Sequence, residues 1–134
     1  MSASIQATIP ERPPVHLSEL EFDALSALAD ALRNSQPAVS DMLTEELGRA
    51  HVHVVGELPS GTIRMGSKVR FVDERTGAER AVQIVFPHQA DIMHDKISVG
   101  TPVGAALIGL KVGDRITCRF HDGHQRHLEI LAVE

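Results

Sequence analysis

The spacing of hydrophobic residues changes near residue 52, and this change constrains the fold more than any other feature of the sequence. Before it, apolar residues recur every three or four positions, as on one face of a helix. From about Val52 they alternate with polar residues, as in strands with one buried face. A chain in which helices come first and strands follow is predicted to have an α+β fold.

The first part of the chain is predicted to form a helical hairpin. In "LSELEFDALSALADALRN", Ser18 and Glu21 have the S-x-x-E spacing of a capping box. Pro37 suits the first position of a second helix, "PAVSDMLTEELGRA". The short break between these amphipathic helices favours an antiparallel pair, a short coiled coil. With about 14–17 residues each, the helices would be about 21–26 Å long.

The second part is predicted to form a mostly antiparallel sheet with one short helix packed on it. Thr101 and Pro102 suit the N-cap and first position of that helix, which we expect to run to about Ile108. Gly109 suits its end. The expected strands cover residues 63–71, 82–86, 97–99, 116–120 and 128–132.

The hydrophobic pattern also restricts the register of the last hairpin. A two-residue turn at 122–123 would place apolar residues opposite polar ones. A loop of odd length keeps the apolar residues on one face, which register must obey. A three-residue loop pairs Cys118 with Leu128, and a five-residue loop pairs Phe120 with Leu128. Both loops turn the same two histidines toward solvent, His121 and His127.

Composition and organisation narrow the possible functions. We expect a flexible leader (1–14), the helical hairpin (15–52) and a C-terminal domain (53–134). A net charge of −5 and an aromatic content of 3% disfavour a nucleic-acid binder that works by phosphate neutralisation or base stacking. The single cysteine, Cys118, excludes an intramolecular disulfide. With neither a signal peptide nor a membrane-spanning stretch evident, we expect a cytoplasmic protein without membrane contact.

Residue patterns typical of enzymes and metal sites are weak in this chain. "ISVGTPVGAALIGLKVGDRI" (97–116) has the spacing of neither common phosphate-binding glycine motif, and a strand, a capped helix and a turn explain it. The eight histidines include no recognised ligand set, and Cys118 is expected to be a buried apolar residue. We therefore expect no catalytic residue, no bound metal and no cofactor.

The tip of the predicted hairpin is a cluster of polar residues with two possible interpretations. It is either an ordinary solvated turn or an acidic probe that inserts into a partner. The residues expected there are Asp30, Asn34, Ser35, Gln36, Ser40 and Asp41.

Three stretches of the second part resemble the C-terminal domain of the Gre transcript-cleavage factors. They are "MGSKVRFVDERTGAERAVQIV", "ISVGTPVGAALIGLKVGDRI" and "HLEILAVE", within residues 62–134. The resemblance implies an FKBP-like fold that docks on RNA polymerase near the rim of the secondary channel, with the coiled coil pointing toward the channel. The matching positions are Gly66, Ser67, Val69, Gly77, Ile97, Ser98, Pro102, Gly104, Leu107, Gly109, Val112, Gly113 and Asp114.

The same resemblance implies which residues meet the polymerase. The docking segment would be the turn into the short helix, made of Ser98, Gly100, Thr101, Pro102, Val103 and Gly104. "PVGAALIGLKVGD" and the short N-terminal part are most similar to a branch of the family described as regulating nucleoside diphosphate kinase. A functional link to that kinase is therefore expected.

The chain departs from the cleavage factors in the length of its helices. The family pattern implies a coiled coil roughly twice as long, whose tip acids help to hold a catalytic metal in the polymerase. A carboxylate must lie about 2 Å from such a metal to bind it. The shorter hairpin predicts a non-enzymatic transcription regulator that occupies the channel entry and competes with Gre factors without stimulating cleavage. The alternatives are a direct binder of nucleoside diphosphate kinase and an FKBP-like peptidyl-prolyl isomerase.

Overall fold

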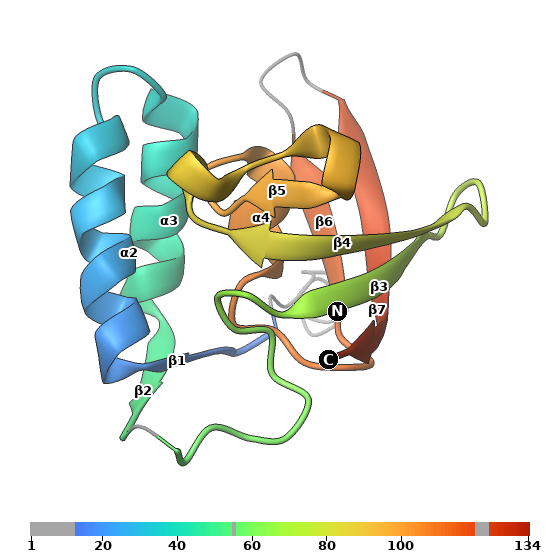
Figure 1. Cartoon of the computed structure of the whole chain (residues 1–134), viewed down its shortest axis with the longest axis horizontal. Coiled ribbons are helices and arrows are strands. Elements are labelled where there is room, and N and C mark those ends of the chain that lie inside the picture. The colour runs from blue at the N-terminus through green and yellow to red at the C-terminus, as the bar shows by residue number, and fades with distance from the viewer. Residues whose placement is uncertain (1–12, 55, 120–123) are drawn as a thin grey trace, which may run out of the picture.

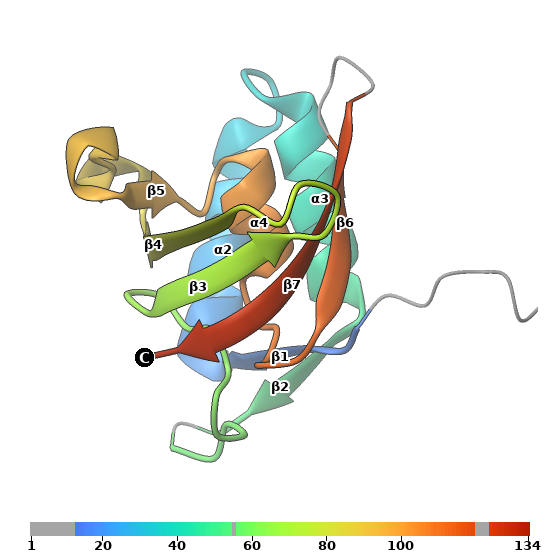
Figure 2. The ribbon, with the colours of Figure 1, turned by 90° about the vertical axis from the view of Figure 1, so that its right-hand side faces the viewer.

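The computed structural model describes residues 13–54, 56–119 and 124–134, and it has the α+β fold predicted from the sequence. A pair of helices stands beside a five-stranded sheet (Figure 1). Figure 2 shows the helices on one face of the sheet, with the short helix between the pair and the strands. Among the described helices, none is long and apolar enough to cross a bilayer. The expected leader lies almost wholly outside the described residues.

The helical hairpin is formed by α2 (Glu19–Leu32) and α3 (Pro37–Gly48). The predicted capping box is confirmed: the Ser18 hydroxyl accepts from the Glu21 backbone N–H, and the Glu21 carboxylate accepts from the Ser18 backbone N–H. Pro37 occupies the first turn of α3, as expected. The helices have 14 and 12 residues, so they are about 21 and 18 Å long, at or below the lower end of the expected range.

The sheet has the strand order β5-β4-β3-β7-β6. Its neighbouring strands are antiparallel except for β4 and β5, which are parallel, so the sheet is mixed. The short helix α4 (Pro102–Leu107) has Thr101 as its N-cap, as predicted. The strands are β3 (Lys68–Asp73), β4 (Glu79–Val85), β5 (Lys96–Ser98), β6 (Arg115–Arg119) and β7 (Gln125–Val133), and the 3-10 turns η1 (Pro87–Gln89) and η2 (Ile92–His94) join β4 to β5.

The first strand of the sheet begins later than predicted, at Lys68 rather than Ile63. Ile63 is fully buried, but its backbone bonds to the segment after α4: Ile63 N–H donates to Leu110 O over 2.7 Å, and Gly109 N–H donates to Ile63 O over 3.0 Å. A turn closed by the Ser67 N–H to Arg64 O bond of 2.9 Å then leads into β3. Alternation therefore predicted burial correctly and strand pairing incorrectly.

The last hairpin keeps its apolar residues on one face but uses neither predicted pairing. Ile116 lies opposite Leu128 and Cys118 opposite Arg126, a shift of two residues from the three-residue-loop register. His127 is exposed, as expected. Phe120 and His121 lie outside the described residues.

A two-stranded parallel ribbon at the base of the hairpin was not predicted. It joins β1 (Val15–Ser18), just before α2, to β2 (Ala50–His53), just after α3. β1 also bonds to the C-terminal part, because His16 N–H donates to Gly109 O over 2.8 Å. The ribbon therefore connects both ends of the hairpin to the segment after α4.

The main hydrophobic core crosses the expected boundary at residues 52 and 53. It joins Val15, Leu17 and Leu25 to buried residues of the sheet and to Leu107 of α4. A smaller cluster joins Ala29, Val39 and Leu43 of the hairpin to Ala105 of α4. The division into a hairpin unit and a C-terminal unit stays a prediction, and the two parts share their packing.

Candidate functional site

The turn from β5 into α4, residues 98–104, is the candidate docking segment, here called the corner. Thr101 holds it closed, because its hydroxyl donates to Ser98 O over 2.7 Å and accepts from Gly104 N–H over 3.2 Å. Gly100 N–H donates to the Ser98 hydroxyl over 2.8 Å. These local bonds fix the backbone of the corner before any partner arrives.

Burial divides the corner into an inner and an outer part. Ser98, Gly100 and Gly104 are buried, whereas Thr101, Pro102 and Val103 are half-buried. A Cβ added at Gly104 would lie 2.1 Å from Ser98 O, so this glycine is required by close packing. Three of the six predicted docking residues therefore shape the corner from within, and the other three present side chains at its surface.

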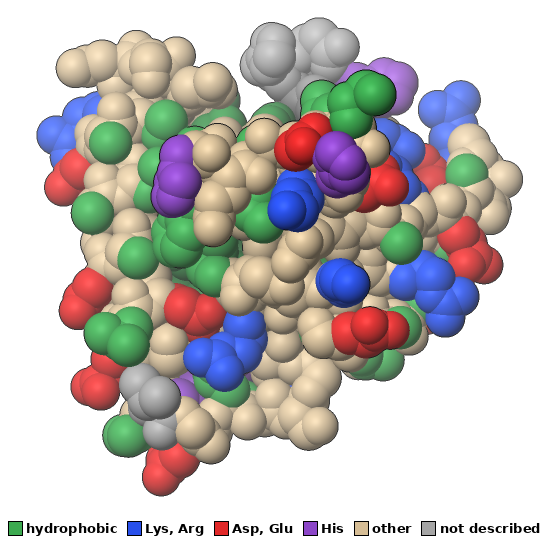
Figure 3. Space-filling model, in the orientation of Figure 1, with side chains coloured by type: hydrophobic (Ala, Val, Ile, Leu, Met, Phe, Trp, Pro, Cys, Tyr) green, Lys and Arg blue, Asp and Glu red, His purple; other side chains and the backbone are tan. Residues whose placement is uncertain are grey.

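The loop beside the corner, residues 86–96, carries exposed hydrophobic residues that the sequence reasoning missed. A Cβ at Gly100 would lie 3.7 Å from Pro87 Cγ, so η1 lies next to the corner, while η2 precedes β5 at the other end of that strand. Ile92 and Met93 in η2 are 78% and 88% exposed. Figure 3 shows hydrophobic and histidine side chains exposed over the segment that carries η1 and η2. Two adjacent large apolar residues outside any predicted strand or helix were the available sequence signal.

Hydrogen bonds hold the backbone of this loop in a defined conformation. Asp91 and Lys96 form a two-bond bridge, with both N–H···O distances 2.9 Å. The Asp91 carboxylate caps η2 by accepting from Met93 N–H over 3.1 Å, and it contacts His94 Nδ1 at 2.7 Å. This His94 contact is the main reason that the pKa of Asp91 is lowered. We expect the ordered turn to reduce the entropy lost when Ile92 and Met93 are covered by a partner.

The hairpin tip lies at the end of α2 and α3 that is farthest from the β1–β2 ribbon (Figure 1). Asp30, Asn34, Gln36 and Asp41 are exposed there, and the Asp30 carboxylate pairs with Arg33. Ser40 corrects the expectation, since it is only 4% exposed and its hydroxyl donates to Ala29 O over 2.7 Å. Ser40 joins the two helices and does not face a partner.

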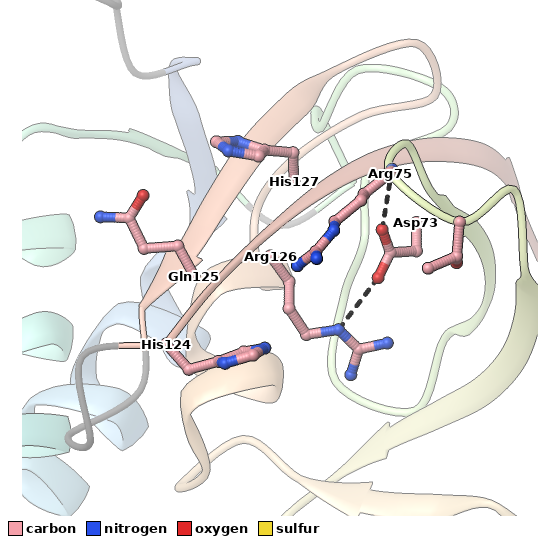
Figure 4. A pocket seen from close by; sticks show the side chains of 7 residues that line it. Asp73, Arg75, His124, Gln125, Arg126 and His127 are labelled. Atoms are coloured by element: carbon pink, nitrogen blue, oxygen red, sulfur yellow. Dashed lines mark hydrogen bonds and ion pairs between the residues drawn. The ribbon is translucent and has the colours of Figure 1, made fainter.

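A shallow pocket lies between the β3–β4 turn and the start of β7, and its charged residues stabilise the fold (Figure 4). Asp73 lies at its wall and accepts from Arg75 N–H over 2.9 Å and from Arg126 Nε over 3.1 Å. The Arg75 N–H, ahead of Arg126, lowers the pKa of Asp73. The carboxylate therefore remains charged and ties the turn to β7.

The structure also bears on the histidine and cysteine expectations. The rings of His51 and His53 lie next to the ring of His16, and this cluster is described further below. Among the described residues, no three His, Cys, Asp or Glu side chains are grouped so as to hold a metal ion. Burial raises the pKa of the Cys118 thiol to about 11, so at neutral pH this residue is a protonated core side chain, as expected.

The capped helix and the mixed sheet lie within a segment that matches a family of transcription elongation factors. The profile described as "Transcription elongation factor, GreA/GreB, C-term" matches residues 58–134. The chain therefore belongs to the GreA/GreB family.

Individual relatives place the chain within this family. The "Regulator of nucleoside diphosphate kinase" of Escherichia coli K12 is 32% identical over 123 residues, which cover 92% of this chain and 90% of that protein. "Transcription elongation factor GreA" of Sinorhizobium medicae WSM419 is 34% identical over 108 residues, covering 81% of this chain and 67% of that protein. The solved structure of a "Prokaryotic transcription elongation factor GreA/GreB from Nitrosomonas europaea" is 36% identical, with a TM-score of 0.71 over 90% of this chain and 98% of that one.

Proposed function

We propose that this protein is a non-enzymatic transcription regulator that binds RNA polymerase near the secondary channel in the cytoplasm. It competes there with Gre factors and does not stimulate transcript cleavage. Family membership supports the choice of partner. The observation that carries the proposal is the shortness of the hairpin. A protein with these helices can dock on the polymerase, but its tip stops short of the site where the transcript is cleaved.

The length of α2 and α3 limits what the tip can reach. At 14 and 12 residues they span about 21 and 18 Å, roughly half the reach that the family resemblance implies for cleavage factors. A carboxylate binds such a catalytic metal only at about 2 Å. Asp30 and Asp41 would stop well short of the polymerase active site if the corner docks as in the longer relatives.

The proposed docking surface consists of the outer corner, which follows β5, and the apolar turn η2, which precedes the same short strand. The corner offers Thr101, Pro102 and Val103, and the turn offers Ile92 and Met93. Exposed apolar side chains on an ordered backbone suit a protein partner, because covering them removes hydrophobic area from water without ordering a flexible segment. The proposed surface therefore combines exposed hydrophobic side chains with a backbone shape fixed by the inner glycines.

Competition on purified core RNA polymerase tests this function. Increasing amounts of this protein should displace a labelled Gre factor, and transcript cleavage in stalled complexes should fall as displacement proceeds. The protein alone should restore no cleavage. Failure to bind at micromolar concentration would rule out the docking proposal, and cleavage by the protein alone would rule out the reach argument.

A second candidate function is direct binding to nucleoside diphosphate kinase, which the names of relatives such as the one from Escherichia coli K12 support. A pull-down of purified kinase without polymerase tests it: a complex formed by the two proteins alone would favour this function. The isomerase alternative has no observation in its favour. Of the four phenylalanines, Phe71 is buried in the core and Phe22 and Phe86 pack against it.

A further inference from the structure

Three histidines meet at the base of the helical hairpin, one from β1 and two from β2. His16 lies opposite His51 in the parallel ribbon, and their rings stack with centroids 5.3 Å apart. The His16 and His53 ring centroids are 5.2 Å apart, and His16 Nδ1 lies 3.0 Å from His53 Nε2. This last contact is a hydrogen bond between two imidazoles, one from the strand before α2 and one from the strand after α3.

The cluster lies where the hairpin is fastened to the rest of the molecule. His16 donates its backbone N–H to Gly109 O, so β1 runs between β2 and the segment after α4. A Cβ added at Gly109 would lie 2.5 Å from Val15 Cγ1, so this segment and β1 are in close contact. Anything that weakens the ribbon therefore weakens the attachment of both helix ends.

Burial and most of the neighbouring groups disfavour protonation of His16. Burial is the first cause that lowers the pKa of His16, followed by Lys111, His53 and His51, while Asp114 acts in the opposite direction. Asp114 is also engaged by Lys111, whose backbone N–H donates to Asp114 Oδ2 over 2.8 Å. A second or third proton on the cluster would thus place several cations together with one nearby carboxylate.

The hydrogen bond between His16 and His53 sets a further limit on protonation. One of the two facing nitrogens must carry a hydrogen and the other must keep its lone pair. If both rings are charged, both nitrogens are donors and they repel each other at 3.0 Å. The cluster can therefore hold one shared proton with the bond intact, and loses the bond when both rings are protonated.

We propose that His16, His51 and His53 form a proton-sensitive joint that fastens the helical hairpin to the sheet near neutral pH and loosens when the cluster becomes fully protonated. The direction of the pH effect on stability follows from the direction in which the pKa of His16 is shifted. Since its pKa in the closed ribbon lies below the ordinary value of 6.5, the stabilisation is complete above pH 6.5 and is lost as the pH falls toward the lowered value. The joint opens locally while the sheet stays folded.

Hydrogen exchange of the full chain at pH 7.5 and pH 5.5 tests the joint. After correction for the intrinsic pH dependence, amides of β1 and β2 should exchange about fivefold or more faster at pH 5.5, while those of β3 and β7 change less than twofold. His16→Gln keeps a polar side chain that does not titrate, and should reduce the pH response of β1 and β2 to below about twofold. His53→Gln should act in the same direction, and serves if the first variant folds poorly.

The matched control is His88→Gln, an exposed histidine in η1 that stacks on Phe86 and lies outside the cluster. It should keep the full pH response of the unmodified protein. Three results would overturn the proposal. They are an unchanged response in both His16→Gln and His53→Gln, equal acceleration of the β3 and β7 amides, and no acceleration of β1 and β2 in the unmodified protein.

Discussion

The corner at residues 98–104 was expected to meet a partner and the hairpin tip was a candidate for the same role, yet the fold holds them very differently. The corner is fixed by three short side-chain and backbone bonds and has a glycine packed against Ser98 O. The tip consists of exposed polar residues, and the N-cap of α3, Gln36, makes no side-chain capping bond. The corner is thus a rigid turn with few exposed atoms, whereas the tip is the solvent-exposed end of the helical hairpin and has many exposed atoms.

This difference shows that a residue pattern shared with a family can reflect packing inside the molecule rather than contact with a partner. Gly100 and Gly104 belong to the segment with the clearest family pattern, and both are buried within the molecule. Ile92 and Met93 belong to no pattern, and they are the most exposed large hydrophobic residues described, after which comes Leu20 at 69%. Substitutions can separate the residues that build the corner from those that would touch a partner.

The largest expected effect comes from Gly104→Ala. Its Cβ would meet the backbone of Ser98 and Val99, with Ser98 O at 2.1 Å, so we expect a loss of about 3 kcal/mol or more in the free energy of unfolding. Urea denaturation followed by circular dichroism measures this. Gly48→Ala is the matched control: nothing lies within 4 Å of its added Cβ at the end of α3. A stable Gly104→Ala protein would show that the corner is adjustable.

A smaller loss of stability is expected from Glu21→Ala. Glu21 Oε2 accepts from Met65 N–H over 2.9 Å, while Oε1 accepts from the Ser18 backbone and hydroxyl, so one buried carboxylate joins α2 to the segment before β3. Removing it leaves buried donors unpaired and should cost about 2–3 kcal/mol. The control is Glu19→Ala, an exposed acid in the same helical turn. Equal effects of the two variants in urea denaturation would contradict this role.

A change of binding without a change of stability is expected from the double variant Ile92→Ser, Met93→Ser. Both side chains are exposed, so the free energy of unfolding should change little, while affinity for core RNA polymerase should fall about tenfold, or about 1.4 kcal/mol. Displacement of a labelled Gre factor measures the affinity. Val54→Ser, an exposed hydrophobic residue after the β1–β2 ribbon, should leave it unchanged. Full affinity in the double variant would exclude the apolar turn from the docking surface.

The sequence predicted what depends on neighbouring residues. The capping box at Ser18, the proline start of α3 and the Thr101 cap each rest on contacts within a few positions, and each was correct. Pairings between distant segments were missed, because periodicity shows which face is buried and not what it meets. The β1–β2 ribbon joins strands 35 residues apart, as the Val15–Ala50 pair shows.

The same limit explains the errors at the candidate site. Ser40 is polar in sequence, but its bond to Ala29 O depends on how α2 and α3 pack. The exposed side chains of η2 lie in a turn, where no hydrophobic period applies. Sequence reasoning therefore located the corner and could not tell its inner residues from its outer ones.

The smallest effect is expected at the hairpin tip, from Asp30→Asn with Asp41→Asn. The Asp30–Arg33 pair is exposed, with side chains 73% and 72% accessible, so its loss should change the free energy of unfolding by less than about 0.5 kcal/mol. If the corner and the apolar turn carry docking, affinity for core RNA polymerase should change by less than about twofold. Asp23→Asn with Glu19→Gln, two exposed acids of α2 outside the tip, controls for the same loss of two negative charges. A tenfold loss of affinity confined to the tip variant would reverse the comparison, because a solvated end with little structural role would then contribute more to binding than the rigid corner.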